Sequence, residues 1–194
     1  MKKIAVLVSG GGTNLAALIN AERDGIIKSG KITAVVSNKA DAYALKRAED
    51  AGIENRAFTK KEYGEAQCDA ICDYLIEKEI DIVVLAGFLV ILGGRILKEF
   101  EGRIINIHPS LIPSFCGDGF YGLKVHEAAL RYGVKVTGAT VHFVNEITDG
   151  GKIIMQKAVY IEDGDTPEIL QKRVMEEAEW KILPLSVEKV CSEL

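Results

Sequence analysis

The chain has 194 residues, 48% hydrophobic and 27% charged, and its 24 Lys and Arg against 28 Asp and Glu give a net charge of −4. This size predicts one globular domain, and the acidic balance argues against a protein that coats nucleic-acid backbones. The four cysteines form no C-x-x-C pair and have no histidines at zinc-ligand spacing, so no metal is expected. No stretch approaches the ~20 apolar residues of a membrane-spanning helix, which favours a cytoplasmic protein.

Short runs rich in Val, Ile and Leu alternate with helical patterns over the first two thirds of the chain. Strands are predicted at 3–8, 32–36, 81–86 and 103–107, and helices at 14–22, 41–51, 62–78, 91–100 and 122–131. Because the run at 81–86 has no polar alternation, it is typical of a central strand covered on both faces. The alternation predicts parallel strands joined by helical crossovers.

Beyond residue 133 the pattern changes to a pair of adjacent strands. Runs at 134–144 and 152–161 flank the turn-forming stretch 145–151, which predicts a β-hairpin. A capping residue ahead of Pro167 predicts a final helix over 167–190, in which Pro184 could introduce a bend. The predicted fold class is α/β: a single doubly wound, mostly parallel, Rossmann-like sheet with helices on both faces, a C-terminal β-hairpin extension and a final helix.

A glycine-rich turn, Ser9–Leu15, joins the first predicted strand to the first predicted helix. Glycines let backbone N–H groups approach an anion closely, and a helix start adds unpaired donors. The turn lacks the lysine of the nucleoside triphosphatase loop, and Leu15 stands where the dinucleotide fingerprint has its last glycine. A small phosphate monoester is therefore the favoured ligand, and a tight turn without a ligand is the alternative.

Asn106 and His108 stand two residues apart in Arg103–Pro113, at the predicted end of a parallel strand. This spacing places both side chains on one face, at the edge where open α/β sheets usually bind ligands. An amide donor beside an imidazole can hold a developing oxyanion and move a proton. The alternative is a hydrogen bonder at the strand end and a histidine with a structural role in the core.

A third candidate stretch, Val136–Gly151, carries Thr140 and His142 on one face of a predicted strand and Asp149 in the turn beyond it. An aspartate in a glycine-rich turn is usually only a turn residue. A functional role requires that the fold bring Asp149 to His108, and the spacing alone leaves that open.

Together these segments resemble the glycinamide ribonucleotide transformylases, a family of folate-dependent formyltransferases. The resemblance covers almost the whole chain, and its five motifs occur in the family's order. They are Ser9–Leu15, Leu85–Phe88, Ile105–Pro113, Gly138–Val144 with Asp149–Gly151, and Glu179 ahead of Ile182–Pro184. The resemblance implies one formyltransferase domain over 1–194 that transfers the formyl group of 10-formyltetrahydrofolate to the primary amine of 5-phosphoribosylglycinamide in purine biosynthesis.

By this resemblance Asn106, His108 and Asp149 match the family's catalytic positions. Asn106 and a protonated His108 would stabilise the oxygen of a tetrahedral intermediate, while Asp149 would raise the pKa of the histidine and position a water. This direct transfer requires no metal. The residues that would bind the phosphate and the glycinamide or ribose end of the substrate are Gly12, Thr13, Asn14 and Glu179.

The resemblance places the folate, a co-substrate, in a pocket beyond the strand 81–86. The residues implied in folate binding are Lys61, Leu89, Val90, Ile91, Leu92 and Asn106. Many relatives carry arginine at the positions of Lys61 and Val90, so contacts to the glutamate tail are less well specified than contacts to the pterin. The glycine-rich loop 114–122 beside His108 is a candidate lid over the reacting groups.

Three other functions fit only part of these features. A 10-formyltetrahydrofolate hydrolase uses the same Asn, His and Asp with water as acceptor, but has no use for a phosphate turn. A methionyl-tRNA formyltransferase would ordinarily add a C-terminal domain and a basic surface. A non-catalytic binder of a phosphorylated metabolite would not explain Asn106, His108 and Asp149 together. The expected partners are small-molecule substrates, with no nucleic acid or membrane, and the expected oligomeric state is a monomer or homodimer.

Overall fold

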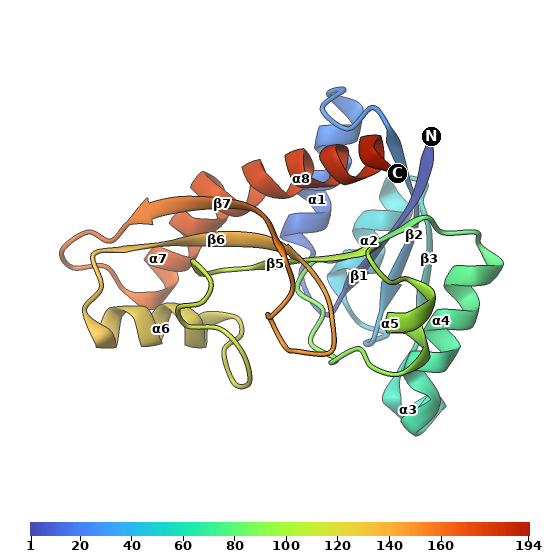
Figure 1. Cartoon of the computed structure of the whole chain (residues 1–194), viewed down its shortest axis with the longest axis horizontal. Helices are drawn as coiled ribbons and strands as arrows, with labels where there is room; N and C mark the ends of the chain where they lie inside the picture. The colour runs from blue at the N-terminus through green and yellow to red at the C-terminus, as the bar shows by residue number, and fades with distance from the viewer.

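The computed structural model describes residues 1–194 and contains one seven-stranded sheet in the order β3-β2-β1-β4-β5-β6-β7 (Figure 1). The strands are β1 (Lys2–Val8), β2 (Gly30–Ser37), β3 (Glu54–Ala57), β4 (Ile82–Leu85), β5 (Ile104–His108), β6 (Val136–Phe143) and β7 (Ile153–Tyr160). The five strands from β3 to β5 are parallel, whereas β6 and β7 each run antiparallel to the strand before them. The predicted mostly parallel sheet with a C-terminal hairpin is confirmed.

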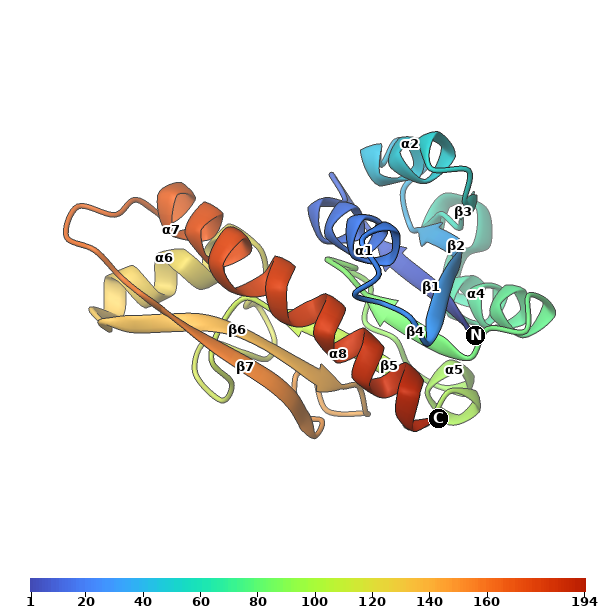
Figure 2. The ribbon, with the colours of Figure 1, turned by 90° about the horizontal axis from the view of Figure 1, so that it is seen from above.

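Helices cover both faces of the sheet, as predicted. They are α1 (Thr13–Arg23), α2 (Tyr43–Asp50), α3 (Lys60–Tyr63), α4 (Gln67–Glu77), α5 (Arg95–Glu99), α6 (Leu123–Tyr132), α7 (Pro167–Val174) and α8 (Trp180–Glu193). Figure 2 shows α1 and α4 on opposite sides of β1.

The central strand β1 separates two hydrophobic cores. Every residue from Ile4 to Val8 is fully buried, and successive side chains of a strand point to opposite faces. Ile4 and Val6 therefore pack with residues of α1 and α8, while Ala5 and Leu7 pack with residues of α4 and α5. Burial of each such Val, Leu or Ile side chain contributes ~1.5–3 kcal/mol, which explains the lack of polar alternation in this strand.

Three elements differ from the sequence prediction. The single helix predicted over 62–78 is divided into α3, a 3₁₀ turn at Gly64–Ala66, and α4. Strand β3 was not predicted, because its sequence, Glu-Asn-Arg-Ala, is polar; it lies at the edge of the sheet, where Glu54 and Arg56 face water. The predicted helix 91–100 forms only over Arg95–Glu99. Gly94 takes a φ of 68°, a left-handed conformation that stops helical geometry from extending further upstream.

The C-terminal helical region begins as predicted, since the Thr166 hydroxyl accepts a hydrogen bond from the backbone N–H of Ile169 and Pro167 occupies the first turn. The region ends at Glu193 and includes a π-helical turn, Met175–Glu179, between α7 and α8. Pro184 lies inside α8, so the departure from α-helical geometry occurs upstream of the proline. This π-turn carries Glu179, one of the predicted site residues.

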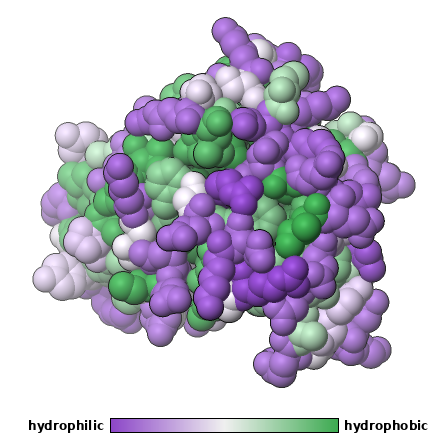
Figure 3. Space-filling view, turned by 45° about the vertical axis from the view of Figure 1, so that its right-hand side comes forward, coloured by the Kyte–Doolittle hydropathy of each residue, from purple (hydrophilic) through white to green (hydrophobic).

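The connections that follow β4, β5 and β6 come close to one another, at the lower centre of Figure 1. Because the carboxyl ends of parallel strands share an edge, the segments after β1 and β4 also lie there. No helix of this structure is long and apolar enough to cross a bilayer. Figure 3 shows polar side chains over most of one face of the molecule, with smaller apolar patches between them.

Candidate active site

The glycine turn between β1 and α1 presents a row of free backbone donors. Gly12 adopts the left-handed conformation, with φ 71° and ψ 37°, and α1 begins at the next residue. None of the backbone N–H groups from Gly10 to Leu15 donates to a protein acceptor. Unpaired N–H groups at the start of a helix attract anions, so this geometry suits the phosphate predicted at Gly12, Thr13 and Asn14.

A buried carboxyl lies directly behind the turn. Asn14 Nδ2 donates to Glu179 Oε2 at 2.6 Å, and both residues are buried. Burial raises the pKa of Glu179, and the hydrogen bond from Asn14 only partly opposes that shift. Asn14 Oδ1 is buried without a hydrogen-bond partner. The structure thus brings two of the predicted substrate residues into contact and leaves one buried acceptor without a partner.

Replacing Glu179 with glutamine is expected to stabilise the protein at neutral pH. Because the folded-state pKa lies above the unfolded value, the contribution of Glu179 to stability is fully present below about pH 4.5 and is lost as pH rises through the raised pKa. The Tm of the variant should therefore match the parent at acid pH and exceed it increasingly above pH ~4.5. For a chain of this size, each kcal/mol recovered raises Tm by ~2–4 °C. Thermal melts across pH check this, and a constant Tm difference would contradict it.

Four polar side chains gather on one face of the sheet where β5 ends. In the antiparallel register, Asn106 lies opposite His142 and His108 opposite Thr140. His142 Nδ1 lies 2.8 Å from the carbonyl oxygen of Phe143, which can only accept, so in a neutral ring the proton is on Nδ1. His142 Nε2 is then free to accept from Asn106 Nδ2 at 3.1 Å.

Asp149 comes to this face from the turn after β6, where its backbone φ is 54°. Its Oδ2 atom lies 3.5 Å from His108 Nδ1 and accepts from the Gly117 N–H at 2.8 Å. Its Oδ1 atom lies 3.5 Å from both His142 Nε2 and Asn106 Nδ2. The fold therefore brings the three predicted catalytic residues together and adds His142, to which the sequence interpretation gave no role.

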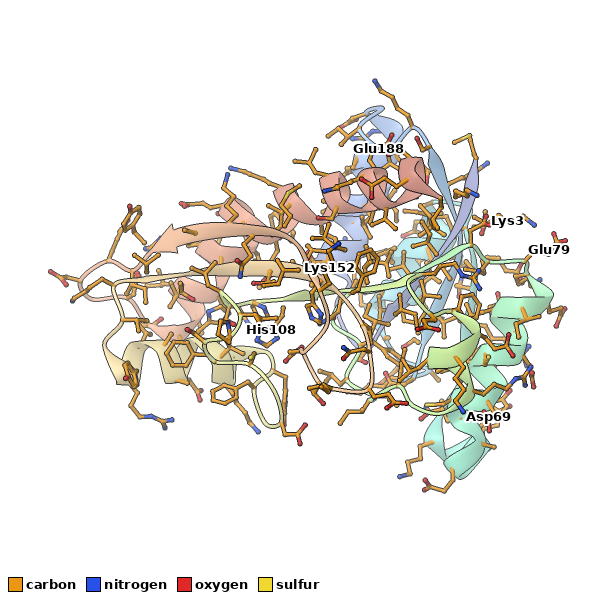
Figure 4. The ribbon with its side chains drawn as sticks, in the orientation of Figure 1. Lys3, Asp69, Glu79, His108, Lys152 and Glu188 are labelled. Carbon is orange, nitrogen blue, oxygen red and sulfur yellow. The ribbon has the colours of Figure 1, made fainter.

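The loop at 114–122 covers the other edge of His108. His108 Nε2 donates to the carbonyl oxygen of Phe115 at 2.9 Å, so both ring nitrogens face acceptor atoms. Figure 4 shows His108 near the end of β5, beside this loop. The loop thus contacts both His108 and, through Gly117, Asp149.

Burial, rather than the carboxylate, decides the direction of the histidine's pKa shift. The pKa of His108 is lowered by burial, although Asp149 and the Phe115 carbonyl raise it. The sequence interpretation named Asp149 as a raising influence, which agrees in sign, but the net direction is downward. Burial alone would raise the pKa of Asp149, yet the close approach of His142 and the charge of His108 outweigh it, so the pKa of Asp149 lies below its usual value.

A cleft of about 530 Å³ opens beside these residues. Its walls are the segments 85–92, 106–109, 117–122 and 142–149, which include the predicted folate residues Leu89 to Leu92 and Asn106. The backbone N–H of Leu89 donates to Ser9 Oγ at 2.8 Å, so this wall is tied to the glycine turn. Lys61 lies on α3 and is not among the residues that line the cleft.

Comparisons with known proteins agree with this arrangement. Residues 2–187 match the Formyl transferase family. The chain is 46% identical over 98% of its length to the trifunctional purine biosynthetic protein adenosine-3 of Gallus gallus, of which it spans 18%. It is 44% identical over 96% of its length to the phosphoribosylglycinamide formyltransferase of Haemophilus influenzae, of which it covers 86%.

A solved structure of similar sequence shares the whole fold. The glycinamide ribonucleotide transformylase 1 of Symbiobacterium toebii superposes with a TM-score of 0.93 at 40% identity, over 100% of this chain and 89% of that one. Since the family match spans nearly all of the sequence and the fold, this chain belongs to the formyl transferase family.

Proposed function

We propose that this protein transfers the formyl group of 10-formyltetrahydrofolate to the primary amine of 5-phosphoribosylglycinamide. The observation that carries the proposal is the meeting of Asn106, His108 and Asp149, with contacts of 3.5 Å, at a cleft that adjoins a turn of free backbone donors. The relatives named above support the same reaction. In this proposal residues 1–194 form one formyltransferase domain, acting as a monomer or homodimer, and the four free cysteines suit a reducing cytoplasm.

The polar groups of the cleft suit acyl transfer to an amine. As the amine adds to the formyl carbon, the formyl oxygen gains negative charge, and Asn106 and His108 would donate to it. Asn106 now donates to His142 and, at a longer 3.5 Å, to Asp149; the longer bond is the one that a substrate oxygen can replace at least cost. Asp149 would hold the imidazole by its Nδ1 atom and favour its charged form.

The phosphorylated substrate would extend from this centre to the glycine turn. Its phosphate would accept from the N–H groups of Gly12, Thr13 and Asn14, none of which donates within the protein. Glu179 and the unpartnered Asn14 Oδ1 are acceptors, and the hydroxyl groups of a ribose are donors that can satisfy them.

The residues around the cleft suit the folate, which supplies the formyl group. A flat aromatic ring with polar edges calls for apolar walls and a few backbone groups. Val90, Ile91 and Leu92 offer these, while the N–H of Leu89 is already bonded to Ser9. Lys61 is proposed as a charge for the glutamate tail outside the cleft.

Ligands are expected to change the exposure of the loop 114–122. The bond from His108 Nε2 to the Phe115 carbonyl occupies the donor that a substrate oxygen would need, so productive binding requires the loop to shift. Limited proteolysis with a protease that cleaves after aromatic residues should cut near Phe115 and Phe120 at different rates with and without both substrates. Equal cleavage rates would contradict a role for the loop as a lid.

The decisive experiment mixes the protein with 10-formyltetrahydrofolate and follows the folate product. Turnover that requires 5-phosphoribosylglycinamide supports the transferase. Equal turnover without the amine would show a 10-formyltetrahydrofolate hydrolase instead of a transferase. No turnover with either the amine or water as acceptor would indicate a binding protein.

A further inference from the structure

Helix α2 covers one side of the glycine turn. The N–H of Ala44 donates to the carbonyl oxygen of Gly10 at 3.0 Å, and Arg47 Nε donates to that of Gly11 at 2.8 Å. Three residues apart, Ala44 and Arg47 share one face of the helix. A Cβ atom on Gly12 would lie 2.6 Å from the Cβ of Ala44, so the turn packs against this face with no room for a side chain.

The pairing of the carbonyl groups determines where the N–H groups of the turn point. The only cis peptide bond in the chain is elsewhere, at Ile112-Pro113, so the peptide units that join Gly10, Gly11 and Gly12 are trans. In a trans unit the C=O and the N–H point in opposite directions. Because α2 holds the carbonyl groups of Gly10 and Gly11, the N–H groups of Gly11 and Gly12 point away from α2.

Arg47 also contributes its charge to this unit. A hydrogen bond from a guanidinium to a carbonyl polarises the whole amide, which strengthens the N–H of the same peptide as a donor. That N–H belongs to Gly12. The guanidinium lies 4.9 Å from the ring centre of Tyr43, a cation–π contact that helps to orient it.

We propose that Arg47 is a positioning residue that makes this site prefer a phosphorylated over an unphosphorylated substrate. It acts through the Gly11-Gly12 peptide rather than by touching the phosphate. The inference rests on the proposed function, in which the turn binds the phosphate of the amine substrate. The inference also explains why the site prefers a phosphorylated substrate. The preference comes from the side chain of Arg47, which is 36 residues from Gly11 in the sequence.

The test compares R47M, which removes the charged donor, with R47K, which retains one. Lys46→Met is the matched control, because Lys46 is the residue before Arg47 on α2 and pairs instead with Glu49 and Asp50 on the exposed surface. For each variant, kcat and KM are measured with 5-phosphoribosylglycinamide and with its dephosphorylated riboside. R47M is expected to lower kcat/KM for the phosphorylated substrate ~10-fold, mainly through KM, with the riboside unchanged, and R47K should restore most of the loss.

Equal losses with both substrates, or an equal loss in Lys46→Met, would overturn the inference, because a structural defect or net charge would then explain the result.

A second experiment separates this inference from the proposed function. Inorganic phosphate is titrated against the parent, R47M and Lys46→Met while the amide resonances of Gly12 and Thr13 are followed by NMR. If the parent protein formylates nothing, the proposed function fails. Phosphate binding that is weaker in R47M alone would still support the role of Arg47. Equal phosphate binding in the parent, R47M and Lys46→Met would overturn that role.

Discussion

Replacing Asp149 with asparagine is expected to lower kcat by ~10²–10⁴ while leaving the KM for the phosphorylated amine nearly unchanged. The carboxylate contacts His108 Nδ1, His142 Nε2 and Asn106 Nδ2, each at 3.5 Å, so its charge acts on every group of the centre. Asparagine retains the size and tolerates the backbone φ of 54° at this position, which makes the substitution a test of charge rather than of folding.

The same substitution has a definite effect on the pH profile. Burial already lowers the pKa of His108, and Asp149 is the first influence that opposes it. Without the carboxylate the pKa of His108 falls further, so less of the charged imidazole is present at neutral pH and the maximum of kcat moves to lower pH. NMR titration of the His108 ring and kcat against pH measure both shifts. A parental kcat in Asp149→Asn would show that the carboxylate has no catalytic role.

A suitable control is Asp163→Asn, which removes an exposed carboxylate that lies outside the cleft and on another segment of the chain. Its substitution should leave kcat within about threefold of the parent, as surface substitutions outside a bonded network usually have small effects.

The central strands could be predicted from the sequence, because strands buried on both faces lack polar alternation, as in Ile82–Leu85. Strand β3 could not be predicted in this way. It lies at the edge of the sheet, where Glu54 and Arg56 face water, so its sequence lacks the apolar run of a buried strand. The π-turn at Met175–Glu179 could not be predicted, because five residues inside a longer helical pattern are too few to show a period of their own.

Site residues that depend on local geometry could be predicted from their spacing, whereas Asp149, which depends on long-range register, was predicted only through the family resemblance. Asn106 and His108 share a face because a strand has a period of two residues. The contact from His108 to Asp149 instead requires the antiparallel pairing of β5 with β6. Arg47 was missed for a similar reason: its bond to Gly11 exists only because the crossover after β2 places α2 against the turn after β1.

Replacing His108 with alanine is expected to lower kcat by ~10²–10³, the usual cost of removing one donor to a developing oxyanion. His108→Gln is a useful second variant, because glutamine provides an N–H donor of similar reach but cannot become positively charged at neutral pH. If hydrogen bonding alone stabilises the oxygen, glutamine should restore much of the rate. If the charged imidazole is required, both variants should be equally slow.

Binding of the phosphorylated amine should survive both changes, because the glycine turn and Glu179 lie on other elements, after β1 and between α7 and α8. Calorimetric titration with 5-phosphoribosylglycinamide should therefore give a Kd within about threefold of the parent, since sites without shared partners act almost independently. A large loss of affinity together with an unchanged kcat would assign His108 to substrate binding instead. The expected pattern, slow turnover with intact binding, would place the phosphate at one end of the crevice and the reacting carbonyl at His108, with the two held apart by the sheet.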